Sequence, residues 1–542
     1  MPIFRQPSYF WLFALIFVTT ACQQPKSSHQ GLSPLPQDSF IQVYLNHSES
    51  SEYQESYRQQ TRLGDDLEKI IADTISQAKS TVDVAVQELR LPKVAQALVD
   101  RQKAGVKVRL ILENNYSRPW SSYTPNDIKK LAPRDREKYN EFHQFIDLNK
   151  DNKLIPEEIN QRDALVIIQN AKIPWIDDQA DGSAGSSLMH HKFVIVDNRI
   201  VIVSSANFTL SDTSGDFTSR TSLGNANNLL KIDSPELASV FTQEFNIMWG
   251  DGVGGKPDSL FGLKKPLRSP KQITLGASKI TVQFSPASPT QPWSKTSNGL
   301  IGEHLNSATK SIDLALFVFS EQHLADILEQ RHKQNVGIRA LIDAQFAYRF
   351  YSEALDMMGV ALSNKCKYEI DNQPWTNPIT SVGVPVLAKG DLLHHKFAVI
   401  DNEIVITGSH NWSDAANSGN DETLIVIENP LVAAHYVREF ARLYAKAQIG
   451  LPSEMQAKVP AEMKKCPKII APTSSQNQLT QKVNLNTATQ EELVILPGVG
   501  KKLAQKIIIA RQQQKFTSLQ DLERIPGVSA KMLDKWRDYV SF

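Results

Sequence analysis

A pattern of apolar runs and amphipathic segments occurs twice along the chain. Residues 82–113, VDVAVQELRLPKVAQALVDRQKAGVKVRLILE, align without a gap with residues 312–343, IDLALFVFSEQHLADILEQRHKQNVGIRALID. In each copy, a short apolar run precedes a segment with helical spacing of apolar residues, and a second apolar run follows. Strand, helix and strand in this order indicate a crossover between parallel strands. The pattern predicts α/β architecture with two similar halves, each with a mainly parallel sheet covered by helices.

The repeat extends on both sides of this unit. Residues 41–47, IQVYLNH, match residues 280–286, ITVQFSP, and residues 241–250 match residues 436–445. We therefore place the two halves at 41–250 and 280–450, each of a size typical of a domain. Residues 251–279 between them are rich in Gly, Pro and Lys and are expected to be a connector. Their GxGG lacks the preceding strand and following helix that a nucleotide-binding loop requires.

Each half also contains a hairpin pattern next to residues with catalytic potential. FVIVDNRIVIV and FAVIDNEIVIT are expected to be paired strands joined by tight turns. Before them, His190 and Lys192, and likewise His394 and Lys396, stand two residues apart and face one side of a strand. An imidazole can attack or protonate and an ammonium can neutralise phosphate oxygens. Two such matches within a longer repeat are far more specific than one.

The complete motifs identify a family resemblance. Both copies read His, any residue, Lys, four residues and Asp, followed by a small-residue turn ending in Asn; the second adds Gly408, Ser409 and Glu422. On these residues, positions 41–447 resemble the phospholipase D superfamily, whose HxK(x4)D signature occurs twice per active site. The resemblance implies halves packed about a pseudo-two-fold axis with one site between them. The first copy departs from the pattern, with Ser204 in place of Gly and Asn227 where the second copy has Glu422.

The resemblance also implies a mechanism through a phosphohistidine, without a cofactor. One histidine attacks phosphorus and the other protonates the leaving oxygen; we assign His190 as the nucleophile. Glu422 is expected to hydrogen-bond a histidine and fix its tautomer, whereas Asn227 has no charge, so the two histidines should differ in pKa. His191 and His395 face away and are expected to be packing residues. The implied catalytic set is His190, Lys192, Asp197, Asn207, His394, Lys396, Asp401, Ser409, Asn411 and Glu422.

The last segment, residues 482–542, has a different pattern. It contains two helix-turn-helix units with the matching turns LPGVGKK and IPGVSAK, and ten Lys or Arg against six Asp or Glu. It resembles the paired helix-hairpin-helix domain of the competence protein ComEA, which implies a small all-α DNA-binding domain. Glycines in such turns expose backbone N–H groups to a phosphate. A protein-interaction module is the alternative. The expected DNA contacts are Gly498, Gly500, Lys501, Lys502, Lys506, Gly527 and Lys531.

An acidic loop in the first half resembles a calcium site. DLNKDNKLIPEE, residues 147–158, fills the ligand positions of an EF-hand-like loop with Asp147, Asn149, Asp151, the Lys153 carbonyl and Glu158. Position 6 is Asn152 and not Gly, although Asn tolerates the left-handed conformation, and Pro156 follows within the loop. We expect structural Ca²⁺ here; a solvated loop is the alternative.

The N-terminus indicates export. Arg5 precedes the apolar run YFWLFALIFV and then TTAC. About ten apolar residues are too few to span a bilayer of roughly 30 Å but suit a signal peptide. Residues 1–22 resemble a bacterial lipoprotein signal, with Cys22 lipidated; a secretory signal or an uncleaved anchor is the alternative. We therefore expect localisation at the bacterial cell envelope, on a tether of residues 23–40. In an oxidising compartment Cys366 and Cys466 could pair, but sequence does not establish that they meet.

Composition limits the choice of substrate. With 41% hydrophobic and 22% charged residues the chain is globular, and its net charge of +1 makes no global case for nucleic acid or membrane binding. Local features favour a phosphodiesterase acting as an envelope-tethered DNA nuclease, with a polar linker at 451–481 leading to the DNA-binding domain. The alternatives are a phospholipase D or phosphatidyl transferase acting on membrane lipids, and a DNA-binding envelope protein whose enzyme part is weak. Sequence leaves open the cleavage mode, the membrane face and the oligomeric state.

Overall fold

The fold is taken from a computed structural model. It describes residues 1, 32–183, 187–369, 371–466, 482–490, 493, 496, 499, 501–525, 527–537 and 539–542. Cys22, Gly498 and Gly500 lie outside the described residues, as do the side chains of Lys501, Lys502 and Lys531. Within the described part, no helix is long and apolar enough to cross a membrane.

The first half is built on one seven-stranded sheet. Its strand order is β1 (Ile41–Leu45), β9 (Asn228–Asp233), β8 (Ile200–Ser204), β7 (Lys192–Val196), β4 (Thr81–Val86), β5 (Lys107–Leu112) and β6 (Trp175–Asp177). Three helices pack on its outer face through a core of Val, Leu, Ile and Ala: α1 (Leu67–Ser76), α2 (Pro92–Lys103) and α6 (Ala164–Asn170). A small hairpin, β2 (Glu52–Gln54) and β3 (Thr61–Leu63), precedes α1.

The second half repeats this arrangement with additional edge strands. Its nine-stranded sheet has the order β10 (Lys271–Leu275), β11 (Ser278–Phe284), β19 (Thr423–Glu428), β17 (Ile404–Gly408), β16 (Lys396–Ile400), β12 (Ser311–Leu316), β14 (Gly337–Ile342), β15 (Val382–Val384) and β20 (Gln448–Ile449). The outer core involves α9 (Ser297–Asn306), α10 (Gln322–Lys333) and α11 (Glu353–Met357). Two short strands, β13 (Phe319–Ser320) and β18 (Trp412–Ser413), pair beside it.

Both sheets are mixed rather than mainly parallel as expected. The repeated strand–helix–strand units do pair in parallel, β4 with β5 and β12 with β14. The hairpins β7–β8 and β16–β17 are antiparallel, and they join β4 and β12 in antiparallel register as well. A second parallel pair follows each unit, β5 with β6 and β14 with β15. Strands joined by a tight hairpin turn pair in antiparallel register, and each hairpin enters the sheet on the other side of β4 or β12.

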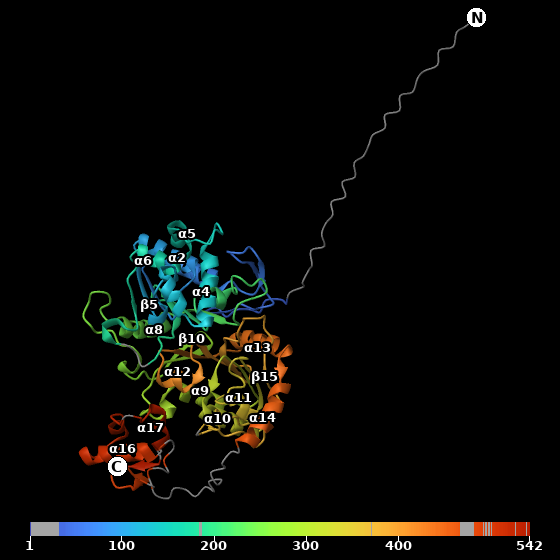
Figure 1. The fold of residues 1–542 in the computed structure, drawn as a ribbon. Coiled ribbons are helices and arrows are strands. Elements are labelled where there is room, and N and C mark those ends of the chain that lie inside the picture. The colour runs from blue at the N-terminus through green and yellow to red at the C-terminus, as the bar shows by residue number, and fades with distance from the viewer. Residues whose placement is uncertain are drawn as a thin grey trace.

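The two halves share one hydrophobic core. Between the inner faces of the sheets lie α8 (Pro235–Trp249) and α13 (Pro430–Ala445), whose apolar sides meet residues from both sheets. Aromatic rings dominate this layer, with Phe241 packed edge-to-face against Phe193 and Phe284, and Phe397 against Tyr436. Figure 1 shows the halves stacked in this way. Large buried aromatic surfaces at the contact are typical of a permanent interface.

The first half carries an insertion between β5 and β6. It contains α3 (Pro125–Lys130), α4 (Pro133–Ile146) and α5 (Pro156–Arg162), and leads into α6. An aromatic cluster of Phe142 and Phe145 from α4, with Trp120 and Phe217, attaches the insertion to the sheet domain. Short 3-10 helices occur throughout the chain, at Asn114–Tyr116, Trp120–Ser122, Ala180–Gly182, Gly262–Lys264, Trp293–Lys295 and Leu519–Leu522.

Segments expected to be linkers are partly built into the fold. Within residues 251–279, β10 joins the second sheet, and the ammonium of Lys265 is fully buried between Glu244 and Asp421. At the N-terminal side, the described end of the expected tether packs on α13: His435 bonds to the Pro36 carbonyl and Arg438 to that of Ser33. These segments were expected to be linkers from their composition. Strand pairing and individual polar side chains attach them to the folded halves.

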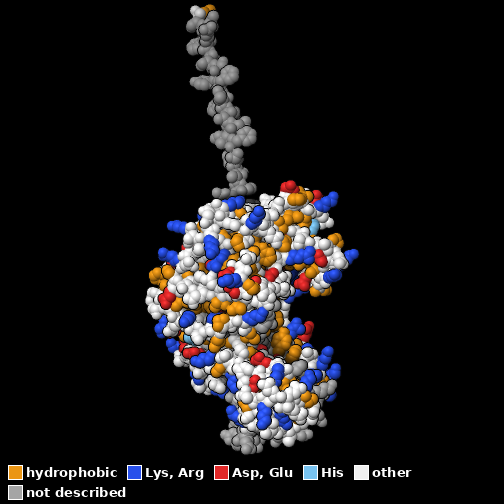
Figure 2. Space-filling view, turned by 90° about the vertical axis from the view of Figure 1, so that its left-hand side faces the viewer, with side chains coloured by type: hydrophobic (Ala, Val, Ile, Leu, Met, Phe, Trp, Pro, Cys, Tyr) orange, Lys and Arg blue, Asp and Glu red, His pale blue; other side chains and the backbone are white. Residues whose placement is uncertain are grey.

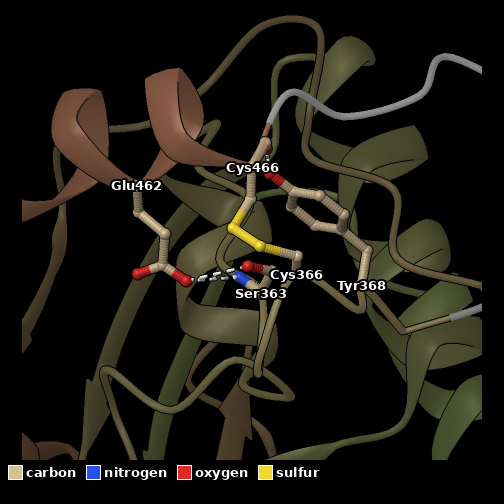
Figure 3. Close-up of a disulfide and its surroundings, with 5 residues drawn as sticks. All are labelled: Ser363, Cys366, Tyr368, Glu462 and Cys466. Carbon is tan, nitrogen blue, oxygen red and sulfur yellow. Dashed lines mark hydrogen bonds between the residues drawn. A yellow bond between two sulfur atoms is a disulfide. The ribbon is translucent and has the colours of Figure 1, made fainter.

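The expected linker after the second half begins as a helix. Residues of α14 (Ser453–Lys465) end at Cys466, which forms a disulfide with Cys366, with the Cα atoms 5.0 Å apart. Glu462 of the same helix accepts hydrogen bonds from the Ser363 backbone N–H and hydroxyl at 3.2 and 2.9 Å, as Figure 3 shows. The two cysteines therefore meet, and α14 is part of the second half.

The C-terminal module has its own core. It includes α16 (Lys501–Gln513), α17 (Ala530–Trp536) and the parallel pair β21 (Val483–Asn484) and β22 (Val540–Ser541) around buried Trp536 and Phe516. Lys535 of α17 forms an ion pair with Asp371 of the second half at 2.7 Å. On the face shown in Figure 2, basic and acidic side chains are intermingled, in keeping with the small net charge.

Candidate active site

Two backbone hydrogen bonds bring the HxK motifs together. The His190 N–H donates to the Asp421 carbonyl at 2.9 Å, and the His394 N–H donates to the Ala226 carbonyl at 3.1 Å. Each bond joins a residue two positions before one hairpin to a residue two positions before β9 or β19 of the other half. This reciprocity is the expected pseudo-two-fold relation, and it places both histidines at one position between the halves.

Glu422 holds the histidine of the opposite half. Its Oε2 lies 2.7 Å from His190 Nδ1 and accepts a 2.6 Å hydrogen bond from the Ser409 hydroxyl. Asn420 donates to its other oxygen at 3.1 Å. With Nδ1 engaged, the Nε2 atom of His190 is the ring nitrogen left to meet a substrate. Ser409 belongs to the implied catalytic set, and its hydroxyl donates to Glu422, so it positions that carboxylate.

Asn227 is the counterpart of Glu422 at the second histidine. Its Oδ1 lies 3.0 Å from His394 Nδ1 and accepts a 2.7 Å hydrogen bond from the Ser205 hydroxyl. Its amide nitrogen donates to the Asp212 carbonyl at 3.0 Å. The two histidines therefore have the same geometry but different partners, a carboxylate for His190 and an amide for His394.

Burial changes the proton affinity of every cation in the site. Both histidines are 7% exposed and both lysines 1%. Burial lowers the pKa of His190 to about 4 and that of Lys192 to about 8, and it lowers the pKa of His394 and Lys396 well below their ordinary values. Glu422 opposes the effect of burial at His190, since its negative charge favours the imidazolium. His394 has no carboxylate in direct hydrogen-bond contact, which separates the two histidines chemically.

The lysines are fixed by the motif itself. Lys192 Nζ donates to the His190 carbonyl at 2.8 Å and to Gln87 at 3.3 Å, and Lys396 Nζ donates to the His394 carbonyl at 2.6 Å. Lys396 also lies 5.0 Å from the centre of the Phe317 ring. Each ammonium is thus held beside the histidine two residues earlier, where it can neutralise a phosphate oxygen.

Asn207 lies at the site, and Asn411 is its counterpart in the second half. The Oδ1 atoms of both side chains are buried without a hydrogen-bond partner among the described residues. Asn207 lines a cavity that reaches His394. Buried polar atoms without a partner carry a desolvation cost, which is typical of groups that bind a ligand. Asn207 is placed beside His394 as expected, and the role of Asn411 stays a prediction.

Asp197 and Asp401 are not at the site, contrary to expectation. Each follows the last residue of its strand, at the end of β7 or β16 away from the histidine. Asp197 accepts hydrogen bonds from the backbone N–H groups of residues 79–81, and Asp401 from those of residues 309–311. Both have positive φ, 53° in each case, in the hairpin turns. These carboxylates fix each hairpin turn to the start of the neighbouring strand, β4 or β12, and have a structural role.

His191 and His395 support the interface, as expected. Both are fully buried. His191 Nδ1 lies 2.8 Å from the Thr423 hydroxyl, and His395 Nδ1 lies 3.1 Å from the Asn228 amide of the first half. These contacts tie each motif to the other half from the face opposite the site.

A cavity of about 170 Å³ opens beside His394. The insertion of the first half provides much of its wall, and sequence reasoning missed these residues because no motif marks them. Aromatic side chains and charged side chains of both signs meet there. Among them are Glu88, Arg90, Trp120, Arg134, Lys138, Phe142, Asp212 and Phe317.

The expected calcium loop lies between α4 and α5. Asn152 has φ 64°, the left-handed conformation that its place in the loop required. Asp147 and Asp151 point to loop amides, and Glu158 accepts from the N–H groups of Leu148, Asn149 and Ile155. Among the described residues no three His, Cys, Asp or Glu side chains are grouped to hold a metal ion. The oxygen donors suit Ca²⁺ chemically, and calcium binding stays a prediction.

Two of the expected DNA contacts, Lys506 and Gly527, are described in full in the C-terminal module. Gly527 has φ 106°, and a Cβ added there would lie 3.7 Å from Lys506 Nζ. The second turn and α16 of the first unit therefore meet at one place, next to an exposed lysine side chain.

Comparison with known proteins matches both parts of the chain. The family described as cardiolipin synthase, PLD-like domain, matches residues 71–249 and 301–444, more than half of the chain. A helix-hairpin-helix motif matches residues 478–541. Among curated proteins, mitochondrial cardiolipin hydrolases of Mus musculus and Xenopus laevis are 26% and 29% identical over 182 and 142 residues. The alignments cover 32% and 26% of this chain, and 72% and 57% of those proteins.

Solved structures with a similar fold were also found. Nuc from Salmonella typhimurium, a phospholipase D family member, has 20% identity, with 32% of this chain and 99% of that chain covered and a TM-score of 0.25. Phosphatidylserine synthase from Haemophilus influenzae has 11% identity, with 80% and 94% covered and a TM-score of 0.45.

Proposed function

Because the chain belongs to the family described as cardiolipin synthase, PLD-like domain, we propose that it is a phosphodiesterase whose two histidines act in turn on one phosphorus atom. The observation that carries this proposal is the placement of His190 and His394 at one site, each with Nδ1 engaged and Nε2 left for the reaction. DNA is the proposed substrate, and the cell envelope is the proposed location.

In the first step, His190 Nε2 forms a bond to phosphorus as the bond to the leaving oxygen breaks. His394 donates the proton from its Nε2 to that oxygen. In the second step, His394 removes a proton from water, and the hydroxide displaces His190, which restores both side chains. Splitting the displacement into two steps is the advantage of a covalent intermediate.

Glu422 supports His190 as the nucleophile. A phosphorylated imidazole with Nδ1 still protonated is cationic, and the carboxylate 2.7 Å away stabilises that charge. Lys192 and Lys396 bind the non-reacting phosphate oxygens. The amides of Asn207 and Asn411 add hydrogen bonds to the crowded phosphorus centre.

Two observations favour DNA as the substrate. The helix-hairpin-helix match lies on the same chain, and its α17 contacts the second half through Lys535 and Asp371. The cavity beside His394 combines aromatic rings with Arg90, Arg134 and Lys138, groups suited to bases and phosphates. Membrane lipid is the second candidate, since the curated relatives named above are cardiolipin hydrolases.

The location rests on the N-terminal sequence, an apolar run followed by TTAC, and on the disulfide. Disulfides persist in oxidising compartments outside the cytosol. We propose that Cys22 carries the lipid and that the enzyme faces away from the cytosol.

A substrate panel tests the proposal. Protein without residues 1–22 is incubated, with EDTA present, with plasmid DNA, single-stranded DNA and vesicles of cardiolipin or phosphatidylcholine. We expect DNA cleavage that His190→Ala and His394→Ala abolish. Lipid hydrolysis with intact DNA would replace the nuclease by a phospholipase. Activity of the histidine variants equal to that of the wild type would refute the mechanism.

A further inference from the structure

The first half lacks the glutamate that the second half provides, but it has a different carboxylate nearby. Counted from the shared Ser-x-Asn turn, Asp212 stands where the second half has Ala416. In the second half, the carboxylate is Glu422, directly before β19, and the short helix after the turn has Ala416. The first half has the reverse arrangement. Asn227, directly before β9, is neutral, and the carboxylate is Asp212 in the short helix α7 (Leu210–Thr213).

Asp212 is buried and held in a defined position. Its side chain accepts hydrogen bonds from the Asn207 backbone N–H at 3.0 Å and from the Asn225 amide at 2.5 Å. It is 4% exposed. Its Oδ1 lies 3.3 Å from the Asn227 amide nitrogen and 3.8 Å from His394 Nδ1. A carboxylate is therefore present at His394, one hydrogen bond further out than Glu422 is at His190.

This position has two chemical consequences. The Asn227 amide nitrogen donates to the Asp212 carboxylate at 3.3 Å and to the backbone carbonyls of Asp212 and Asn225. The amide oxygen therefore faces His394, and Nδ1 of His394 carries its proton as the donor. In addition, a negative charge at 3.8 Å favours the imidazolium form of His394. The other groups that act on His394 are cationic or neutral: Lys396 and His395 on its own strand, and Lys192 and His190 opposite. Charged groups of both signs line the cavity further out, at Glu88, Arg90, Arg134, Lys138 and Glu141.

We propose that Asp212 is a positioning residue for the general acid, and that it replaces in the first half the carboxylate that Glu422 provides in the second. It acts through Asn227 and by its charge on His394, without touching the substrate. This inference rests on the proposed function of His394 as the residue that protonates the leaving oxygen.

An isosteric charge exchange tests the proposal. Asp212→Asn removes the charge, and the double variant Asp212→Asn with Asn227→Asp moves it to the atom that contacts His394. We expect Asp212→Asn to lower kcat/KM on DNA at least 10-fold and to shift the alkaline limb of its pH profile to lower pH, since His394 loses its proton more easily. The double variant should recover most of the activity.

A second substrate separates positioning from structure. Bis(4-nitrophenyl) phosphate has a leaving group that needs little protonation, so Asp212→Asn should change its first-turnover release of nitrophenol less than 2-fold. Equal losses on both substrates with a lower melting temperature would make Asp212 structural and overturn the proposal. Failure of the double variant to recover activity, at an unchanged melting temperature, would overturn it as well. An active His190→Ala variant would instead refute the proposed function.

Discussion

The two histidines are equivalent in geometry and unequal in charge. His190 has a carboxylate on Nδ1 and His394 an amide. Since a covalent intermediate needs a stabilised cation and a general acid needs a proton that leaves easily, this difference assigns different tasks to the two residues. The asymmetry arose within a duplicated unit whose other site residues, Lys and Asn, are retained in both copies.

Removing the charge of Glu422 should affect chemistry more than binding. We expect Glu422→Gln to lower kcat about 100-fold or more with little change in KM, because the phosphohistidine cation loses its counter-charge. Steady-state kinetics on DNA measures this. Glu428→Gln, at the far end of the strand that follows Glu422 and paired with Lys279, is the matched control and should behave like the wild type. A fall in KM with unchanged kcat would contradict the assignment.

The pH profile should reveal the buried lysine. Burial lowers the pKa of Lys192 to about 8, so its ammonium is present below that pH and lost above it. Lys396 shifts in the same direction. Activity requires both the proton of His394 and the ammonium of Lys192, so we expect the alkaline limb of kcat/KM to be centred at or below about pH 8. A limb near pH 10, where an ordinary lysine titrates, would show that burial does not lower the pKa of Lys192.

The motif residues of the site were predictable from sequence, because spacing fixes which side of a strand they face. Two expectations failed for a physical reason. Asp197 and Asp401 occur at the right spacing for the signature, but a strand of five residues separates them from the histidines. The roles of Ser205 and Asp212 could not be predicted from sequence. They depend on contacts with the Asn227 side chain that only the folded chain brings about.

At the level of elements, the repeat predicted the crossover units and hairpins correctly. Their pattern of alternating and continuous apolar runs reports burial directly. The pattern does not show which strands pair or in which direction. The antiparallel pairs in each sheet were therefore not predicted. The segments that contain β10 and α14 were expected to be linkers because they lack apolar periodicity. Strand pairing and one disulfide attach them to the second half instead.

The disulfide should stabilise the second half. It joins residues 100 positions apart. The cross-link lowers the entropy of the unfolded chain, which raises the free energy of unfolding by about 4–5 kcal/mol. We expect Cys366→Ser with Cys466→Ser to lower the melting temperature measurably, and a reductant to do the same to the wild type. The double variant should be insensitive to reductant, and an unchanged melting temperature would contradict the prediction.

The acidic loop should respond to calcium. Ligand at 100 times its Kd stabilises the folded state by about 2.7 kcal/mol, so Ca²⁺ should raise the melting temperature of the wild type, and EDTA should reverse this. We expect Glu158→Gln to lose the response. Glu157→Gln, at the exposed neighbouring position, should keep it. A response equal in both variants would place the ion elsewhere.

The molecule as a whole combines one composite site with a separate module that we propose to hold DNA. Ion pairing between Lys535 and Asp371 links that module to the second half. Its own core of Leu, Ile and Trp side chains indicates that it folds as a unit. Holding and cutting should therefore be separable by deletion.

Removal of residues 467–542 tests this division. We expect DNA affinity to fall at least 10-fold and its dependence on salt to weaken, since lysine contacts to phosphates are lost. Hydrolysis of bis(4-nitrophenyl) phosphate should stay within 2-fold of the wild type. Titration of labelled DNA at two salt concentrations measures the first effect. Unchanged DNA affinity would favour the protein-interaction alternative for the module.

The reciprocal bonds from His190 to Asp421 and from His394 to Ala226 also have a temporal consequence. Each histidine meets its partner only when both halves have docked, and His190 also requires synthesis of the chain to residue 422. A nascent or unfolded chain therefore contains the whole signature but no working site. For an enzyme proposed to attack DNA, this order of events would keep the site inactive while the chain is being made.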